Sequence, residues 1–259
     1  MPLFSGDGFE IPTLLKTTLD DNDCLLGVDN TGILFKITKP NLSAALASGK
    51  TTTPSTPYPS GMALLLDGGS LIDKSGNNRN ASPVGANTPA IATGLDGKQV
   101  FRWDGTGTQE LQVLPFLSNT TGATLYCVCT LGSSDNYNLV RTAALDDYWK
   151  FVEGSGYFGT FRNSRYEGYP SSMPSAGSHL ISIHASVDSY EVVVDTVSKG
   201  VRPSSYVPGD RFRIGVNDKL FTGDIALLLV YPQYTQQGST SDLGVKNAIK
   251  SAYPSLPFS

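Results

Sequence analysis

Short β-type segments separated by turn residues occupy most of the chain and most constrain how it can fold. They are rich in β-branched and aromatic residues, lie about a dozen residues apart, and are bounded by Gly, Asn, Asp or Pro. We expect strands at residues 62–66, 99–104, 110–114, 124–131, 138–143, 148–153, 157–162, 179–187, 190–197, 212–216 and 225–231. This spacing favours an all-β sandwich over alternating βαβ units.

Composition agrees with short strands and narrows the class of partner. The 259 residues include 27 Gly and 16 Pro, and only 16% of them are charged. Because the net charge is -4 and the sequence has no basic stripe, we expect no nucleic-acid partner. The longest apolar run, residues 225–231, is too short to cross a bilayer, so we expect no membrane insertion. The three cysteines do not make a disulfide framework.

The tail of the sequence changes to a helical period. Val245, Ala248, Ile249 and Ala252 recur on one side of a helix expected over residues 241–252. Asp242 stands near the start of this helix, and Pro254 ends it. The sandwich is therefore predicted to carry a short C-terminal helix.

The N-terminal part of the chain has a pattern of its own. Two strand candidates, residues 24–28 and 33–38, flank the turn sequence DNTG at 29–32. A Thr/Pro/Ser-rich stretch with the composition of a semi-extended linker follows. A hairpin this small holds no core, so a partner or further copies of the chain must bury it. The predicted organisation is an N-terminal segment at 1–45, a linker at 46–61 and a β domain at 62–259.

Three ordered motifs in the β domain resemble a known family. The first is a D-x-S-G-N type turn, the second surrounds the sequence RWDG, and the third precedes the C-terminal helix. Their residues are Asp73, Ser75, Gly76, Asn77 and Asn80; Gly97, Val100, Arg102, Trp103, Asp104 and Gly105; and Phe221, Gly223, Ile225, Ala226, Val230 and Tyr231. Together they resemble the laminin-G-like, concanavalin-A-like jelly-roll domains of bacterial and phage surface proteins. The resemblance implies a jelly-roll β-sandwich, a fold that carries several functions.

The opening segment is similar to a narrower group, the N-terminal segments of phage tail fibre proteins. The matching positions are Asp21, Asp23, Leu25, Val28, Asp29, Gly32, Lys36, Ile37, Thr38, Asn41 and Leu42, and Phe35 stands where a second lysine is usual. The resemblance implies a homotrimeric tail fibre in the virion that docks to other tail or baseplate proteins through residues 1–45. Asp21, Asp23, Leu25, Val28, Phe35 and Ile37 are its candidate attachment or oligomerisation residues.

Residues 145–170 concentrate the residue types that bind sugars. Aromatic rings stack on the apolar faces of sugars, while carboxylates, amides and guanidinium groups bind the hydroxyls. The candidate glycan contacts are Tyr148, Trp149, Tyr157, Arg162, Asn163, Arg165, Tyr166 and Tyr169, of which the two last fall in a Gly/Ser/Pro-rich stretch that we expect to be a loop. The competing interpretations place these aromatics in the sandwich core or at a subunit contact.

Metal binding and catalysis find little support in the residues. The carboxylates near Asp21 and Asp73 lack the spacing of a calcium loop, and Cys127 and Cys129 lack a second ligand cluster. His179 and His184 are five apart on one strand, hence on opposite faces. No glycosidase or other catalytic motif is present, so we expect neither a cofactor nor an enzyme. The function expected is recognition of a host surface polysaccharide; a purely structural virion role and a glycan depolymerase are the alternatives.

Overall fold

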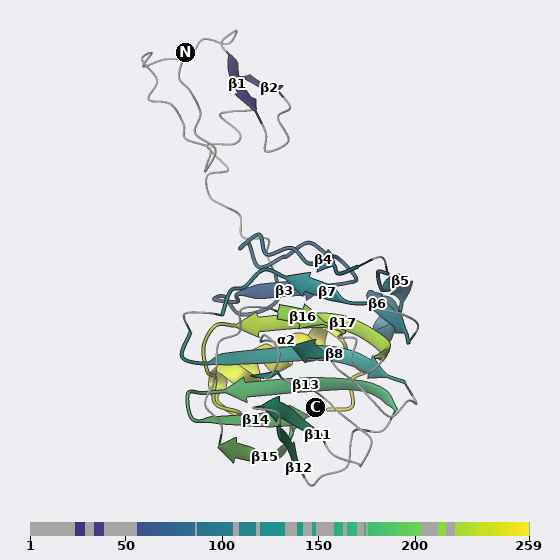
Figure 1. The fold of residues 1–259 in the computed structure, drawn as a ribbon, viewed down its shortest axis with the longest axis vertical. Coiled ribbons are helices and arrows are strands. Elements are labelled where there is room, and N and C mark those ends of the chain that lie inside the picture. The colour runs from purple at the N-terminus through teal and green to yellow at the C-terminus, as the bar shows by residue number, and fades with distance from the viewer. Residues whose placement is uncertain are drawn as a thin grey trace. The chain divides into compact units, whose positions relative to one another are not determined.

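The structure is a computed structural model of the whole chain (Figure 1). It describes strands at 24–28 and 34–38, and residues 56–258 except 86, 106–108, 118–119, 133–138, 142–146, 149–157, 163–164, 170–173, 175, 204–211 and 216–220. Two compact units are present, residues Met1–Thr53 and Pro54–Ser259. Among the described residues, no helix has the length and apolar character needed to cross a membrane.

A large antiparallel sheet forms the centre of the second unit (Figure 1). In spatial order it contains β15 (Val197–Pro203), β14 (Ser189–Val194), β13 (Gly177–Ala185), β8 (Ala123–Leu131), β17 (Thr222–Tyr231), β6 (Gln99–Asp104) and β5 (Ala90–Thr93), with β3 (Leu64–Asp67) also paired to β17. The 3-10 turn η1 (Leu95–Gly97) joins β5 to β6. A four-stranded sheet consists of β4 (Ser82–Pro83), β7 (Leu111–Val113), β16 (Phe212–Ile214) and β9 (Val140–Arg141).

The main core lies between these two sheets. Residues of β8 at alternate positions contribute Leu125, Cys127 and Cys129, and β16 contributes Phe212 and Ile214. All five are at most 2% exposed, as expected for the inner faces of a sandwich. Cys127 and Cys129 thus share the inner face of β8, and both are free thiols.

A second core covers the outer face of the large sheet. Helix α2 (Thr240–Ala252) buries Val245 and Ile249 there, and Ala248 and Ala252 pack against the same cluster. The predicted helical face is therefore confirmed. The opposing residues on β8 are Tyr126 and Val128, which alternate with the inward-facing cysteines.

Each predicted strand overlaps an observed one, and two differences have clear physical causes. The predicted strand at 190–197 is a hairpin: β14 ends at Val194, and β15 begins at Val197 after a turn at Asp195 and Thr196. Both turn residues have positive φ (48° and 72°), the backbone of a hairpin turn that glycine and asparagine usually provide. Two hydrogen bonds hold Asp195 in this conformation: its N–H donates to the Leu180 carbonyl, and its carboxylate accepts from the Leu180 N–H.

Strand β17 contains the second difference, a bulge between Ile225 and Leu227. The bulge interrupts the period of two, so Ala226 and Leu227 both belong to the outer core while Ile225 and Leu228 belong to the inner core. This explains why the run IALLLVY has no polar alternation: both faces of the strand are covered.

Hydrogen bonds from the side chains of the D-x-S-G-N type turn fix the chain at and before β3. The Asp73 carboxylate accepts hydrogen bonds from the Leu65, Ser75 and Arg79 backbone N–H groups and from the Ser75 hydroxyl. Asn77 Nδ2 donates to the carbonyls of residues 62 and 63. Both Asp73 oxygens are thereby used inside the fold, Oδ1 to hold β3 at Leu65 and Oδ2 to hold the turn itself. In the described part of the chain, no group of three or more His, Cys, Asp or Glu side chains is arranged to hold a metal ion.

The N-terminal unit contains the predicted hairpin. Strands β1 (Cys24–Val28) and β2 (Leu34–Thr38) pair antiparallel, with Leu25 opposite Ile37. The second unit starts earlier than the predicted domain start at 62. Tyr58, within the predicted linker, is 6% exposed in the outer core, and the Tyr231 hydroxyl donates to the Pro59 carbonyl.

Candidate functional site

The region predicted to contact glycan is a small antiparallel sheet of three strands. It consists of β10 (Asp147–Tyr148), β11 (Phe158–Arg162) and β12 (Arg165–Tyr169), in that order. Among the candidate glycan contacts, Tyr148, Arg162, Arg165, Tyr166 and Tyr169 belong to these strands. Trp149, Tyr157 and Asn163 lie outside the described residues.

The pairing register sorts the candidates into two rows. Tyr148 is opposite Phe161, which is opposite Tyr166, so one row across the sheet is entirely aromatic. In the neighbouring row, Asp147 is opposite Arg162, which is opposite Arg165. These rows belong to alternate faces of the sheet. Tyr148 and Tyr166 therefore lie on one face of the sheet, while Arg162, Arg165 and Tyr169 lie on the other, with Tyr169 opposite Phe158.

Placing Tyr166 and Tyr169 in a loop was wrong. Both belong to β12, where Tyr166 is opposite Phe161 and Tyr169 is opposite Phe158. The glycine content suggested a loop, but Gly168 is paired with Gly159 across the two strands. Pairing with β11 satisfies the backbone of this segment, and that partner cannot be recognised from the local composition.

A polar row crosses the four-stranded sheet on the face away from the core. Ser82 on β4 is opposite Gln112 on β7, Gln112 is opposite Arg213 on β16, and Arg213 is opposite Arg141 on β9. Their neighbours along the strands, such as Leu111 and Phe212, are buried in the core. Strand β9 also contacts β10 of the three-stranded sheet.

Glu110 and Arg213 form an incompletely satisfied charge pair beside this row. Arg213 Nη1 lies 2.8 Å from Glu110 Oε1, and the two side chains are 22% and 4% exposed. The approach lacks the alignment of a hydrogen bond, since Glu110 Oε1 and Arg213 Nε are both buried without a hydrogen-bond partner. Such groups are uncommon in folded proteins because each costs free energy. The pattern of residues 212–216 predicts a strand but does not single out this pair, because Glu110 lies about 100 residues earlier in the sequence.

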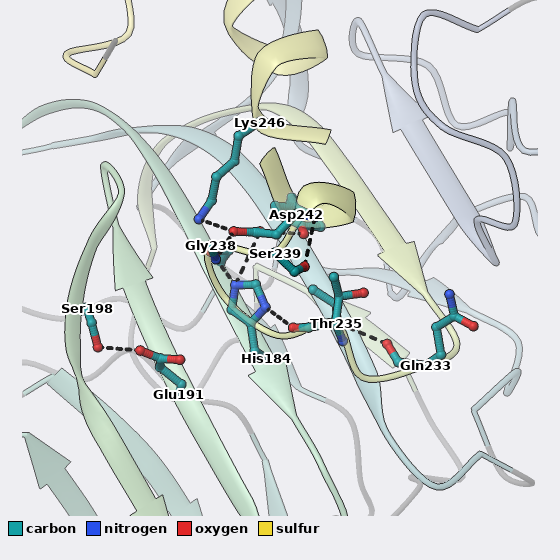
Figure 2. A network of polar contacts seen from close by, with 12 residues as sticks. His184, Glu191, Ser198, Gln233, Thr235, Gly238, Ser239, Asp242 and Lys246 are labelled. Atoms are coloured by element: carbon teal, nitrogen blue, oxygen red, sulfur yellow. Dashed lines mark hydrogen bonds and ion pairs between the residues drawn. The ribbon is translucent and has the colours of Figure 1, made fainter. Parts of the chain in front are cut away.

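A second polar cluster is buried under α2, where it holds the helix to the large sheet (Figure 2). The Asp242 carboxylate accepts hydrogen bonds from Lys246 Nζ (2.7 Å), the Tyr126 hydroxyl (2.8 Å) and the Gly238 N–H (2.7 Å). Asp242 and Lys246 are 0% and 3% exposed. The carboxylate also sits in the first turn of α2, which Ser239 caps. All these contacts are internal, so the cluster serves the fold.

His184 joins this cluster from β13. Its Nδ1 lies 2.7 Å from the Thr235 carbonyl, which can only accept, so Nδ1 carries the proton. Burial, reinforced by the charge of Lys246, lowers the pKa of His184, although the Thr235 carbonyl, Asp242 and Glu191 oppose that shift. The ring is therefore neutral near pH 7, and Nε2 accepts from the Ser182 hydroxyl at 3.1 Å. Its 3.8 Å approach to Asp242 is accordingly no ion pair.

We expect mild acid to destabilise the domain through His184. The unfolded chain takes up a proton at this side chain near pH 6.5, whereas the folded chain, with its lowered pKa, does not. The free energy of unfolding should thus decrease as pH falls below about 6.5, by at most about 1.4 kcal/mol per pH unit from this group. Urea unfolding between pH 7.5 and 5.5 measures this. His184→Asn, which keeps a donor near Thr235, should show a shallower decrease, and parallel curves for the two proteins would refute the assignment.

The other histidine and the thiols lie elsewhere. His179 Nδ1 is 2.6 Å from Asp195 Oδ2 at the β14–β15 turn, far along β13 from His184 and on the opposite face. The two histidines form no joint site, as predicted. A hydrogen bond with Cys127, followed by burial, raises the pKa of the Cys129 thiol. A protonated core thiol is a poor metal ligand.

The candidate attachment residues are placed in part. Leu25 and Val28 lie in β1, and Phe35 and Ile37 lie in β2, with Leu25 opposite Ile37 and Phe35 opposite Gly27. Asp21 and Asp23 lie outside the described residues. The hairpin thus brings Leu25 and Ile37 together as a cross-strand pair.

Comparison with known proteins gives the fold a context. No protein-family model matches the chain, and no curated protein matches it. Among solved structures, domain 4 of AbnA, a GH43 extracellular arabinanase from Geobacillus stearothermophilus, in complex with arabinotriose, matches with a TM-score of 0.59 and 15% identity. The match covers 71% of this chain and 98% of that domain. The fold is an all-β jelly-roll sandwich.

Two larger proteins contain a similar fold. Botulinum neurotoxin type C, whose cell entry depends upon interaction with two ganglioside molecules, matches with a TM-score of 0.56 and 8% identity over 73% of this chain. Trypanosoma rangeli sialidase matches with a TM-score of 0.55 and 12% identity over 88% of this chain. The match covers 51% of the solved neurotoxin chain and 43% of the solved sialidase chain. At these identities the likeness concerns the fold.

Proposed function

We propose that the chain is a bacteriophage tail fibre protein, part of the virion, whose jelly-roll domain recognises a host surface glycan and catalyses no reaction. The observation that carries the proposal is the aromatic row of Tyr148, Phe161 and Tyr166 across the three-stranded sheet. Adjacent rings on one face of a sheet suit the apolar faces of successive sugars. Strand β10 of this sheet contacts β9 of the four-stranded sheet, which carries the polar row.

The similar folds support a binding role. The arabinanase domain was solved with arabinotriose, and the neurotoxin interacts with gangliosides. Two proteins that contain a similar fold thus interact with saccharides or glycolipids. Fold likeness alone does not assign a function, so the proposal depends on the aromatic row.

We expect Tyr166→Ala to weaken glycan binding by about tenfold or more, because it removes on the order of 1–2 kcal/mol of apolar contact. Binding of the full chain to a panel of bacterial surface polysaccharides, measured by calorimetry, tests this. Tyr234→Ala is the matched control, since Tyr234 is 45% exposed and distant in sequence from the three-stranded sheet. Both variants should keep the melting temperature of the wild type.

A different outcome would favour the alternative of a purely structural virion component. If Tyr166→Ala lowers the melting temperature sharply and no polysaccharide binds the wild type, the aromatic row packs in a core or a subunit contact. If the wild type shortens a polysaccharide, the depolymerase alternative replaces both.

The N-terminal hairpin supports the attachment part of the proposal. An isolated two-stranded hairpin is marginally stable in water, so β1 and β2 gain stability if three copies or a docking protein cover them. We propose that Leu25, Val28, Phe35 and Ile37 lie in that contact, which makes the chain a homotrimer bound to other tail or baseplate proteins. Three weak glycan sites would then bind with avidity.

Mass in solution, measured by light scattering, tests the assembly. We expect the full chain to be a trimer and residues 54–259 to be a monomer. The truncation begins at Pro54 because Tyr58 and Pro59 belong to the jelly-roll unit. If both proteins are trimers, the sandwich itself assembles. A monomeric full chain contradicts the homotrimer.

A further inference from the structure

The chain enters the jelly-roll unit along residues 56–66, which we call the entry segment. This unit begins at Pro54, directly after the N-terminal unit. Tension applied to any part of residues 1–53 is carried along the backbone and reaches the sandwich first through the entry segment. The contacts of this segment therefore determine whether the domain stays folded when it is pulled from its N-terminal side.

Residue 63, in the middle of the entry segment, is fixed on both sides. Within the described residues, three side chains donate to the Ala63 carbonyl: Arg79 through Nη1 at 2.6 Å, and Ser75 and Asn77 at 3.3 Å each. The Ala63 N–H donates to the Val230 carbonyl on β17 at 2.7 Å. A carbonyl oxygen has two lone pairs, so three donors exceed what satisfies this group. The arrangement holds the chain at this point more firmly than hydrogen-bond satisfaction requires.

The residues before Ala63 are held as well. Asn77 Nδ2 also donates to the Met62 carbonyl at 3.0 Å, and the Tyr231 hydroxyl donates to the Pro59 carbonyl at 2.9 Å. The preceding Tyr58 is buried in the outer core. The D-x-S-G-N type turn and strand β17 thus fix the entry segment before its own strand, β3, begins.

These contacts connect the entry segment to both sheets of the sandwich. The Arg79 guanidinium lies over the Phe116 ring, 5.1 Å from its centroid, and Phe116 packs against Phe212 of the four-stranded sheet at a centroid distance of 5.1 Å. Strand β17 lies inside the large sheet, paired with β8 on one side and with β6 and β3 on the other. A pull on the entry segment is therefore distributed over two sheets.

We infer that the D-x-S-G-N type turn is a mechanical anchor, which keeps the sandwich folded while the N-terminal segment is under tension. The inference rests on the proposed function, because a virion attached through residues 1–45 and a glycan fixed to a cell surface pull the domain from two sides. Resistance to force is governed by the unfolding rate. Contacts that must break together before the entry segment is released slow that rate.

The test is single-molecule pulling of the full chain in two directions. Thr53→Cys with Val187→Cys provides handles that load the entry segment, and Ser259→Cys with Val187→Cys loads the other end of the chain. Val187 is 56% exposed at the β13–β14 turn. Cys24→Ser is the background, so that only buried cysteines remain beside the introduced ones. Excess unlabelled chain limits each assembly to one labelled copy, and a handle at residue 53 bypasses whatever residues 1–45 bind.

We expect Arg79→Gln to raise the unfolding rate at constant force by about tenfold or more when the entry segment is loaded, because the charged hydrogen bond to Ala63 is lost. Loading from the other end should show little change. Arg102→Gln is the matched control: it removes two hydrogen bonds of 2.7 Å to Asp224, which join β6 to β17 and not to the entry segment. It should leave the rate in the first direction nearly unchanged, and the wild type should unfold without earlier release of the entry segment.

Two outcomes would overturn the inference. In the first, Arg79→Gln accelerates unfolding equally in both directions, in proportion to its loss of stability in urea, which would make the turn an ordinary stabilising element. In the second, the wild type releases the entry segment before the sandwich unfolds. Asn77→Ala, which keeps the arginine, is judged by the same criterion if Arg79→Gln does not fold. A full chain that is monomeric and binds no polysaccharide contradicts the proposed function, whereas the pulling measurements decide only the anchor.

Discussion

Replacing Asp242 with alanine should lower the free energy of unfolding by about 3–5 kcal/mol, because it leaves a buried ammonium group without its counter-charge. Lys246, which is 3% exposed, donates to this carboxylate, and so do the Tyr126 hydroxyl and the Gly238 N–H. Each loses its partner in the variant (Figure 2). Because Tyr126 lies on β8 and Asp242 on α2, the variant also loses a hydrogen bond that fixes the helix to the large sheet. Urea unfolding followed by circular dichroism measures the loss.

Three further variants, one of them a control at an exposed carboxylate, separate the effect of the buried charge from that of packing. Asp188→Ala, which removes an exposed carboxylate at the β13–β14 turn, should change stability by only about 0.5 kcal/mol. Asp242→Asn combined with Lys246→Met, which removes both charges and keeps similar volumes, should be more stable than Asp242→Asn alone. A cost below about 1 kcal/mol for Asp242→Ala would mean that the buried pair does not hold the helix.

Replacing Trp103 with alanine is expected to cost about 3–5 kcal/mol, the usual range for emptying the site of a large core aromatic. Trp103 is 2% exposed in the inner core, and its ring meets the edges of Phe101 and Phe221 at centroid distances of 6.2 and 5.4 Å. Its Nε1 donates to the Gln109 carbonyl at 2.8 Å. The backbone of Gly215 approaches so closely that a Cβ there would lie 2.2 Å from Nε1. Equilibrium urea unfolding with an unchanged slope would confirm a loss of stability rather than a changed fold.

The matched variant at this position is Trp103→Phe. It keeps most of the ring contacts and loses the hydrogen bond to Gln109, so a smaller cost of about 1–3 kcal/mol is expected. Gly215→Ala, whose φ of +69° also disfavours a side chain, should destabilise through the same contact. Equal stability of Trp103→Ala and the wild type would show that the RWDG motif does not anchor the core.

Local patterns in the sequence determined the elements of this fold. The alternation in FRIGV places Phe212 and Ile214 on one face and Arg213 on the other, as the structure has them, and the spacing of Val245 and Ile249 predicted the buried face of α2. Side chains repeat every two residues in a strand and every 3.6 in a helix, so neighbours along the chain report which face is buried. The hairpin β1–β2 was likewise predictable from its turn sequence.

Only the tertiary structure decided which residues meet. The site candidates Tyr148 and Tyr166 fall in one row and Arg162 and Arg165 in the next because of strand register, and a shift of one residue would exchange the faces. The contacts of Asp242 with Tyr126 and of Arg213 with Glu110 join segments more than 100 residues apart. Composition marked the aromatic region, but pairing between distant strands arranges it, and no local pattern encodes that pairing.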